Sequence, residues 1–307
     1  MLTRSSREVV KMVRPGQRPP SVPIVCGIDD AYVVPLCALV ASVAAAHPDP
    51  MTRPRMIVLH SGLNPSSCRA LAMCGERLEL ELQLRRVPVD RGVRFPVTGW
   101  ASRAVYLRLA IPQVVTDEPV VLYLDADTLV LGDLGPLLRQ PLEGAPLAAV
   151  RDPQNPTVGA GIALPGCERI GVPAGREYFN SGVLLLDLVA CAELGVFERA
   201  RRFLVDWPDE VRLWDQDALN VAVDDRWRRL DRRWNTFAMS ALVAQPGFFH
   251  HTAEPVMPLA DLLADEYTAA VLHFAGPVKP WHDEFAVVPL RQLYRRFLPT
   301  GVLAGAR

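Results

Sequence analysis

Two aspartates stand two residues apart in the string YLDAD (residues 123–127), directly after an apolar run that begins at Val120. Side chains alternate faces along a strand, so Asp125 and Asp127 are expected to point the same way. Paired carboxylates at the carboxyl end of a strand can hold a hard divalent cation that keeps coordination positions for phosphate oxygens. The same tripeptide is also typical of an acidic turn after a buried strand.

Four further segments carry polar side chains within apolar sequence, at residues 29–32, 178–182, 214–220 and 273–281. His273 follows the strand-like residues 270–272, and imidazole is a suitable third ligand for a manganese-type ion, although such histidines are also common as core residues. Gly276 would let the backbone approach a phosphate, and Lys279 would supply a positive charge. The last segment is therefore predicted to bind a pyrophosphate.

Alternating strands and helices are predicted to position these segments. The pattern indicates strands at residues 23–28, 55–59, 80–87, 120–124 and 182–188, and helices at 31–46, 65–76, 103–110 and 189–205. Alternation favours an α/β fold with a mostly parallel sheet flanked by helices. Ligands then bind beyond the carboxyl ends of the strands, where Asp29, Asp30, Asp125 and Asp127 are expected to converge.

Composition limits the class of protein. The chain has 307 residues, is 50% hydrophobic and 22% charged, and can form a sizeable core. Its formal net charge of -1 gives no field that would attract nucleic acid, so no nucleic-acid partner is expected. The six cysteines form no C-x-x-C pair, which favours reduced thiols and a cytoplasmic location. Residues 31–48 are uncharged but are better explained by a buried helix than by a membrane span.

Three segments fall outside this pattern. Residues 1–20 are basic and lack the apolar stretch of a secretory signal, so a disordered or weakly helical leader is expected. Residues 151–176 are rich in Gly and Pro and predict a long loop that either binds ligand or is an indifferent insertion. Residues 286–307 predict a basic amphipathic helix that either contacts a membrane peripherally, on its inner face, or packs on the domain.

The strings IDDAY, YLDADTLVLGDL, YFNSGVLLLDL, WDQDALN and HFAGPVKPW occur in this order, and together they resemble glycosyltransferase family 8. This retaining family includes bacterial lipooligosaccharide galactosyltransferases and glycogenins, and the resemblance covers about residues 22–281. It implies a GT-A fold with a single nucleotide-sugar-binding domain at residues 21–285 and a smaller helical extension. It also implies transfer of glucose or galactose from a UDP-sugar, with Mn²⁺ or Mg²⁺, to a glycan, lipid-linked glycan or small-molecule acceptor.

The resemblance also implies roles for individual residues. The metal ligands would be Asp125, Asp127 and His273. The residues that contact the donor would be Ile28, Asp29, Tyr32, Arg108, Ala126, Asp152, Asn180, Ser181, Asp215, Gln216, Gly276 and Lys279. Tyr32 would stack on uracil and Asp29 would bond the base, while Ala31 stands where the family often has asparagine.

Gln216, Asp215 and Arg108 would be the catalytic residues. By resemblance, Gln216 lies on the β face of the anomeric carbon, where a retaining glycosidase has its carboxylate nucleophile. An amide oxygen is a poor nucleophile, so front-face substitution is favoured, with Gln216 and Asp215 stabilising oxocarbenium character. Asp215 is also predicted to cap the helix that follows.

Other functions and sites remain open from the sequence. A sugar nucleotidyltransferase usually has a Gly-rich basic loop after its first strand, and the string GIDD (residues 27–30) is not one. A catalytically silent UDP-sugar-binding protein is the non-enzymatic alternative. His250 and His251, expected in an exposed loop, are a weaker candidate metal site.

Overall fold

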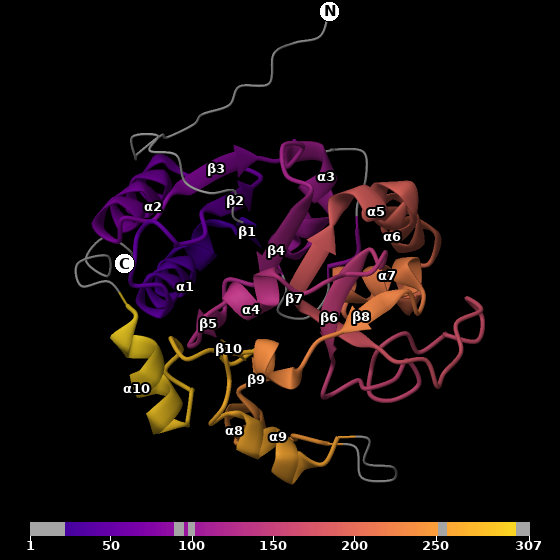
Figure 1. Ribbon diagram of the computed structural model, residues 1–307. Coiled ribbons are helices and arrows are strands. Elements are labelled where there is room, and N and C mark those ends of the chain that lie inside the picture. Colours follow the sequence, from indigo (N-terminus) through magenta and orange to yellow (C-terminus); the bar gives the residue numbers. More distant parts are fainter. Residues whose placement is uncertain (1–21, 89–94, 98–101, 251–256, 299–307) are drawn as a thin grey trace, which may run out of the picture.

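The computed structural model describes residues 22–88, 95–97, 102–250 and 257–298, so the expected leader at residues 1–20 lies outside it (Figure 1). The largest element is a seven-stranded sheet in which only β7 runs against its neighbours. Its strands, in spatial order, are β3 (Leu82–Arg86), β2 (Met56–His60), β1 (Ile24–Gly27), β4 (Val120–Leu124), β7 (Phe179–Asp187), β6 (Leu147–Arg151) and β8 (Trp227–Arg229). The prediction of an α/β fold with a mostly parallel sheet is confirmed.

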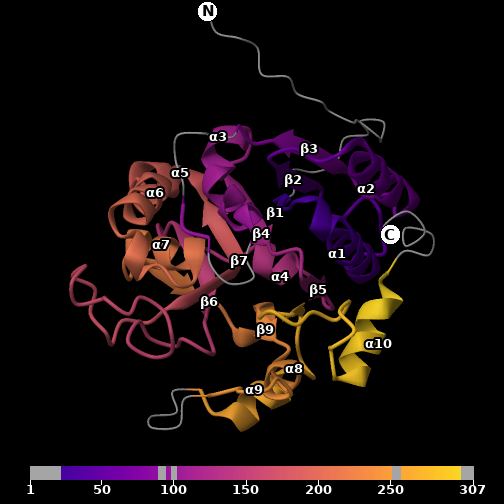
Figure 2. The same cartoon turned by 180° about the vertical axis from the view of Figure 1, so that it is seen from behind.

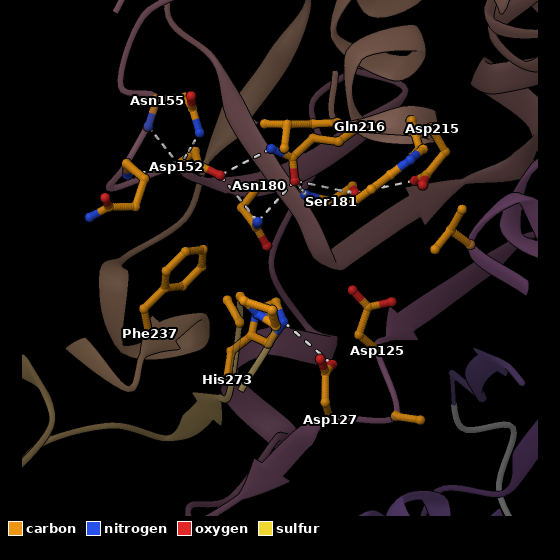
Figure 3. Close-up of a pocket in the computed structure, with 18 of the residues that line it drawn as sticks. Asp125, Asp127, Asp152, Asn155, Asn180, Ser181, Asp215, Gln216, Phe237 and His273 are labelled. Carbon is orange, nitrogen blue, oxygen red and sulfur yellow. Dashed lines mark hydrogen bonds and ion pairs between the residues drawn. The ribbon is translucent and has the colours of Figure 1, made fainter. Parts of the chain in front are cut away.

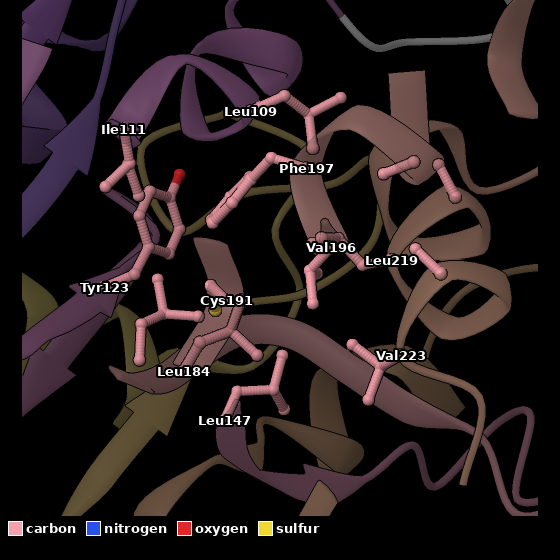
Figure 4. Packing of buried hydrophobic residues seen from close by; sticks show 14 of the residues in the cluster. Leu109, Ile111, Tyr123, Leu147, Leu184, Cys191, Val196, Phe197, Leu219 and Val223 are labelled. Atoms are coloured by element: carbon pink, nitrogen blue, oxygen red, sulfur yellow. The ribbon is translucent and has the colours of Figure 1, made fainter. Parts of the chain in front are cut away.

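Helices cover both faces of this sheet, as Figures 1 and 2 show from opposite sides. One face packs on α1 (Val33–Ala46), α2 (Pro65–Arg77) and α4 (Gly135–Leu138), and the other on η2 (Arg103–Ala110), α5 (Leu188–Glu193), α6 (Val196–Asp206) and α7 (Trp214–Val223). Each face of the sheet has its own hydrophobic core, and successive strand residues alternate between the two. Leu122 packs in the core beneath α1, α2 and α4, and Tyr123 packs in the core beneath η2, α5, α6 and α7 (Figure 4). The central strands are apolar on both faces because both faces are buried.

A second, three-stranded sheet was not predicted from the sequence. It contains β5 (Thr128–Val130), β10 (Val271–His273) and β9 (Thr236–Phe237), in the order β5-β10-β9. Residues 125–127 form the turn that leads from β4 in the large sheet to β5 in the small one. The antiparallel register pairs His273 with Thr128, which brings the histidine next to Asp127. The small sheet therefore assembles the predicted metal ligands.

Two of the predicted helices differ in the structure. Residues 103–110 form 3₁₀ turns that continue into the short helix α3 (Ile111–Val114). The helix expected at residues 189–205 is divided into α5 and α6 because Gly195 adopts a left-handed conformation with φ of 59°. A left-handed residue cannot continue a right-handed helix.

The prediction that Asp215 caps a helix is wrong, because α7 begins at Trp214 and Asp215 lies inside its first turn. Asp217 instead bonds the backbone before the helix, accepting from the N–H groups of Arg212 and Leu213 at 2.7 Å each. Asp217 therefore fixes the approach to α7, and Asp215 is free to face the interior of the protein.

The remaining elements are a long loop and several short helices. Residues 152–176 form the long loop that the sequence predicts, without a helix or strand. Short helices follow at η1 (Asp30–Tyr32), η3 (Pro208–Glu210), η4 (Arg232–Trp234), α8 (Met239–Val243) and α9 (Leu259–Asp265). All six cysteines are free thiols, and five are buried. Within the described ranges, every helix is too short or too polar to span a bilayer.

The predicted terminal helix is present as α10 (Val288–Arg296), and it packs on the domain. Tyr294 is 1% exposed and lies in a cluster with Phe274 and Phe285. Arg291 extends back from the helix and donates to backbone carbonyls of residues 282, 283 and 285. The apolar side of the helix therefore contacts protein, and residues 299–307 of the predicted tail lie outside the described chain.

Candidate active site

A cavity of about 440 Å³ opens where β4 and β6 end and β7 begins. It is bordered by thirteen of the residues named above, and Figure 3 shows how several of them face one another. They are Tyr32, Arg108, Asp125, Ala126, Asp127, Asp152, Asn180, Ser181, Asp215, Gln216, His273, Gly276 and Lys279. Because β7 runs antiparallel to its neighbours, its first residues reach the same edge of the sheet as the last residues of β4.

Three other predicted residues do not line the cavity. Ile28 is 1% exposed and packs in the core. The carboxylate of Asp29 accepts from the N–H of Ala31 at 3.1 Å, and Asp30 accepts from the N–H of Asn64 at 3.0 Å. Asp29 and Asp30 thus follow β1, the neighbour of β4, but each carboxylate bonds backbone close to it, and their convergence with Asp125 and Asp127 stays a prediction.

Asp125, Asp127 and His273 can together hold one metal ion, since one ligand atom from each lies within 4.8 Å of the others. Nε2 of His273 is 3.4 Å from Oδ1 of Asp127. The other oxygen of Asp127 accepts from Nζ of Lys279 at 2.5 Å. On Asp125, Oδ1 accepts from both Arg108 and the Tyr123 hydroxyl, at 2.8 and 3.0 Å. Each carboxylate thus has one oxygen held by hydrogen bonds from neighbouring side chains.

The charges around this cluster suit a divalent cation. Burial alone would raise the pKa of Asp127, but Lys279 and His273 hold it well below its ordinary value, so the carboxylate is ionised. Among the described residues that line the cavity, the carboxylates Asp125, Asp127, Asp152 and Asp215 outnumber the two permanent cations Arg108 and Lys279, which leaves an excess of negative charge. Two carboxylates and an imidazole are a donor set that divalent transition metals accept. The residues present therefore fit a metal ion.

Arg108 connects the metal cluster to α7. It is 4% exposed, and its Nε lies 2.8 Å from Oδ2 of Asp215, while its other nitrogens bond Asp125 and the carbonyl of Ser181. Its guanidinium lies 4.4 Å from the ring centroid of Tyr123, a cation–π contact. Burial raises the pKa of Asp215 to about 7, against the opposing charge of Arg108.

Gln216 is held in one orientation. Its Oε1 accepts from the N–H of Ser181 at 3.0 Å and from Nδ2 of Asn180 at 2.9 Å, and its Nε2 donates to Asp152 at 3.0 Å. Gln216 is 7% exposed and lines the cavity, so the carbonyl oxygen is both fixed and accessible to a ligand.

Gly276 and Lys279 lie on the loop after β10. Gly276 has φ of +90°, and a Cβ there would meet Leu242 at 2.8 Å, so only glycine fits both the backbone and the space. Lys279 lines the cavity but is only 4% exposed. Its ammonium donates to Asp127 and to the carbonyl of Phe274, the latter at 2.7 Å, and its contact with a pyrophosphate stays a prediction.

Two segments to which the sequence gave no specific roles also line the cavity. The Gly/Pro loop contributes Gln154, Asn155, Gly161 and Ile162, and the segment after β9 contributes Leu242 and Phe249. Ile162 and Phe249 are 60% and 71% exposed. His250 is buried rather than exposed, with Nε2 2.8 Å from the carbonyl of Met257, while His251 lies outside the described residues.

Sequence reasoning missed two residues of the site. Asn235 bonds Nδ1 of His273 at 2.9 Å, but it stands in a stretch without a recognisable motif. Gly182 allows the imidazole to lie against β7, because a Cβ there would be 2.4 Å from Cε1 of His273. Gly182 could have been noticed as the one residue without a side chain in the apolar string YFNSGVLLLDL.

Known proteins share this architecture. The crystal structure of the galactosyltransferase LgtC in complex with donor and acceptor sugar analogs matches with a TM-score of 0.71 and 28% identity, covering 90% of this chain and 95% of that one. General stress protein A of Bacillus subtilis is 26% identical over 266 residues, which are 85% of this chain and 87% of the relative.

A second relative is the lipopolysaccharide 1,2-glucosyltransferase of Escherichia coli, which is 30% identical over 234 residues, or 76% of this chain and 64% of the relative. Residues 23–284 match the model of glycosyl transferase family 8, a span that includes both sheets and every wall of the cavity. The chain therefore belongs to glycosyltransferase family 8 and is a glycosyltransferase.

Proposed function

We propose that the chain transfers glucose or galactose from a UDP-sugar to a hydroxyl group of a glycan acceptor, with Mn²⁺ and with retention of anomeric configuration. The observation that supports this most directly is the metal cluster of Asp125, Asp127 and His273 at the wall of a cavity that also contains Gln216. Glycosyltransferases named for lipopolysaccharide and galactosyl transfer are among the relatives, and they motivate the choice of hexose and of a glycan acceptor.

The donor would bind across the cavity from Tyr32 to Gln216. Tyr32 is partly exposed at the rim, where its ring can stack on uracil, and Gly276 permits close approach of the diphosphate. A cation held by Asp125, Asp127 and His273 would neutralise the charge that develops on the departing UDP. Ala126 lies between the two aspartates in the same turn and also lines the cavity.

The chain's own residues favour front-face substitution. Oε1 of Gln216 already accepts two hydrogen bonds, which leaves a poor nucleophile even poorer. It can still stabilise positive charge at the anomeric carbon through its dipole, and Asp215 adds a carboxylate nearby. Arg108 keeps Asp215 and Asp125 at fixed positions, and Asp152, Asn180 and Ser181 hold the amide of Gln216. The acceptor hydroxyl would lose its proton to the leaving diphosphate.

The decisive experiment incubates the purified chain with a panel of UDP-sugars and Mn²⁺ and measures released UDP. We expect release from UDP-glucose or UDP-galactose, loss in EDTA, and loss of at least about 100-fold in Asp125→Asn and Asp127→Asn, because each substitution removes a charged ligand. Asp225→Asn is the matched control, since Asp225 pairs with Arg229 on the surface and does not line the cavity. Full activity in EDTA would contradict the proposal.

Two other results would point to the alternative functions. Binding of UDP with Mn²⁺ in calorimetry, without turnover against any acceptor, would favour a silent binding protein. Release of pyrophosphate from UTP and a sugar phosphate would favour a nucleotidyltransferase.

The free thiols support a cytoplasmic location, where reduced cysteines persist.

A further inference from the structure

A continuous set of hydrogen bonds connects Asp152, just after β6, to the imidazole of His273. Figure 3 labels Asp152, Asn180 and His273 from this set. The connection runs through the side chains of Asn180 and Asn235. All four residues are at most 7% exposed, so water does not compete for these bonds. Amide side chains have a donor end and an acceptor end, and the direction of each bond therefore constrains the next.

The direction at Asn180 is fixed from two sides. Oδ2 of Asp152 is an acceptor and lies 3.2 Å from Nδ2 of Asn180, so the NH₂ group faces the carboxylate. The backbone N–H of Gly182 can only donate, and it lies 2.9 Å from Oδ1 of Asn180. Both neighbours require the same orientation, with the carbonyl of Asn180 directed away from Asp152.

This orientation determines the next two groups. Oδ1 of Asn180 accepts from Nδ2 of Asn235 at 2.8 Å, so the carbonyl of Asn235 faces His273. That oxygen is 2.9 Å from Nδ1 of His273, and two acceptors cannot share a hydrogen bond. Nδ1 must therefore carry the proton, which in a neutral imidazole leaves a lone pair on Nε2. Nε2 is the nitrogen beside Asp127 in the metal cluster.

We propose that Asn235 is a positioning residue that fixes the tautomer of His273, so that Nε2 is always available to a metal ion. This inference rests on the metal site of the proposed function. A partner on the second nitrogen of a ligating histidine commonly sets both the ring orientation and the metal affinity. The same bonds orient Gln216, because Asn180 and Asp152 also hold its amide, so one network aligns the metal ligand and the residue at the reacting carbon.

The test compares Asn235→Leu with Asn235→Asp. Leucine removes the acceptor that faces Nδ1, whereas aspartate keeps an acceptor oxygen there, loses the donor to Asn180 and adds a negative charge. Both changes disturb a buried network and should lower the melting temperature. A purely structural role predicts similar metal binding in the two variants. A positioning role predicts that Mn²⁺ binding falls about 10- to 100-fold in Asn235→Leu and changes by less than about threefold in Asn235→Asp.

Two measurements read this out without any sugar transfer. Long-range ¹H–¹⁵N NMR of metal-free protein labelled at histidine, at pH 9, should show a proton on Nδ1 of His273 in the wild type and in Asn235→Asp. The signal is assigned by its loss in His273→Gln. Electron paramagnetic resonance of free Mn²⁺ gives the affinity of each variant. In Asn235→Leu we expect the Nε2–H form to appear and the affinity to fall.

Asn220→Leu is the matched control, because Asn220 is similarly buried and hydrogen-bonded, but to the backbone of Phe179 and Gln216. It should lower stability and leave the tautomer unchanged. A wild-type ring protonated on Nε2, or an Asn235→Leu variant with wild-type tautomer and affinity, would overturn the inference. Absence of UDP-sugar turnover with the expected tautomer and metal binding would contradict the proposed function alone.

Discussion

Arg108 is a buried cation shared by two carboxylates from different elements. Asp125 belongs to the candidate metal cluster after β4 and Asp215 lies on α7, and both bond the same guanidinium. A guanidinium has several donors in one plane, so it can hold both carboxylates and the carbonyl of Ser181 at once. The distance between the candidate metal cluster and the first turn of α7 is therefore set partly by a single side chain.

Replacing Arg108 with lysine tests this bridging role. Lysine keeps the charge but presents one ammonium, which cannot reach Asp125, Asp215 and the carbonyl of Ser181 together. We expect kcat/KM for UDP-sugar turnover to fall by about 100-fold or more, a loss typical of a misplaced electrostatic group. Arg103→Lys, at an exposed position on the same 3₁₀ segment, should retain activity. Equal activity of both variants would show that charge alone suffices.

A second buried carboxylate, Asp217, should make stability depend on pH. Burial raises the pKa of Asp217 to about 6, although the Tyr178 hydroxyl donates to it at 2.6 Å and opposes the shift. Because the folded pKa lies above the ordinary value, the folded state binds the proton more tightly. This contribution to stability is complete at low pH and is lost as the pH rises from about 4 to about 6.

Tyr178→Phe removes the donor and should raise the pKa of Asp217 further. In the variant, the free energy of unfolding then continues to fall as the pH rises above 6. The variant is therefore destabilised most at pH values where the carboxylate of Asp217 must ionise. We expect it to cost about 1.5–3 kcal/mol at pH 8, typical of a hydrogen bond to a charged group, and distinctly less at pH 4.5. Urea unfolding at both values measures the difference. An equal cost at both would exclude this coupling.

Among the elements, the junction between the two sheets determines where the metal ligands meet. The chain leaves β4, turns through Asp125 to Asp127 and enters β5, which pairs with β10. Ser42 on α1 anchors this arrangement, since its hydroxyl accepts from the N–H of Val130 at 2.9 Å and donates to the carbonyl of Leu39. The turn is therefore fastened to the helix beneath it.

Gly182→Ala tests how closely β7 and β10 must approach. A Cβ at this position would lie 2.4 Å from Cε1 and 2.8 Å from Nδ1 of His273, so the ring must move. We expect Mn²⁺ affinity to fall about 10- to 100-fold, with turnover falling in parallel. Gly62→Ala is the control, because nothing lies within 4 Å of the added Cβ there. Unchanged metal affinity in Gly182→Ala would mean that the ring has another position available.

The sequence predicted the long elements of this site better than the short ones. The apolar run of β4 was long enough to indicate a strand, and the metal pair followed from its end. The strands β5 and β9 have three and two residues, too few to establish an alternating pattern, and within the small sheet only β10 was recognised as strand-like, at residues 270–272. Asn235 was missed for the same reason, since its role depends on the pairing of β9 with β10 and not on its neighbours in sequence.

For the molecule as a whole, the question is what α10 adds to the catalytic unit. The division of the chain into a domain at residues 21–285 and a tail at 286–307 stays a proposal. Tyr294 is buried against Phe274, so the helix packs on the segment that follows His273. Arg295 and Arg296 remain exposed in its last turn. Deleting the helix would therefore remove core contacts together with any membrane contact.

Charge reversal separates these two contributions. We expect the double variant Arg295→Glu and Arg296→Glu to retain the wild-type melting temperature, because both side chains are exposed. If the helix contacts anionic lipid, less of the double variant than of the wild type should float with vesicles that contain phosphatidylserine. The binding free energy should weaken by about 1 kcal/mol for each arginine replaced. Equal flotation of wild type and variant would exclude a membrane contact through these residues.

The central position of β7 also bears on how the site is lost. The amide of Asp125 donates to the carbonyl of Gly182 at 2.8 Å, and β7 lies between β4 and β6 in the centre of the large sheet. A hydrogen bond between central strands opens only when the sheet itself comes apart. Hydrogen exchange at the amide of Asp125 should then require global unfolding, whereas amides on the Gly/Pro loop should exchange by local opening.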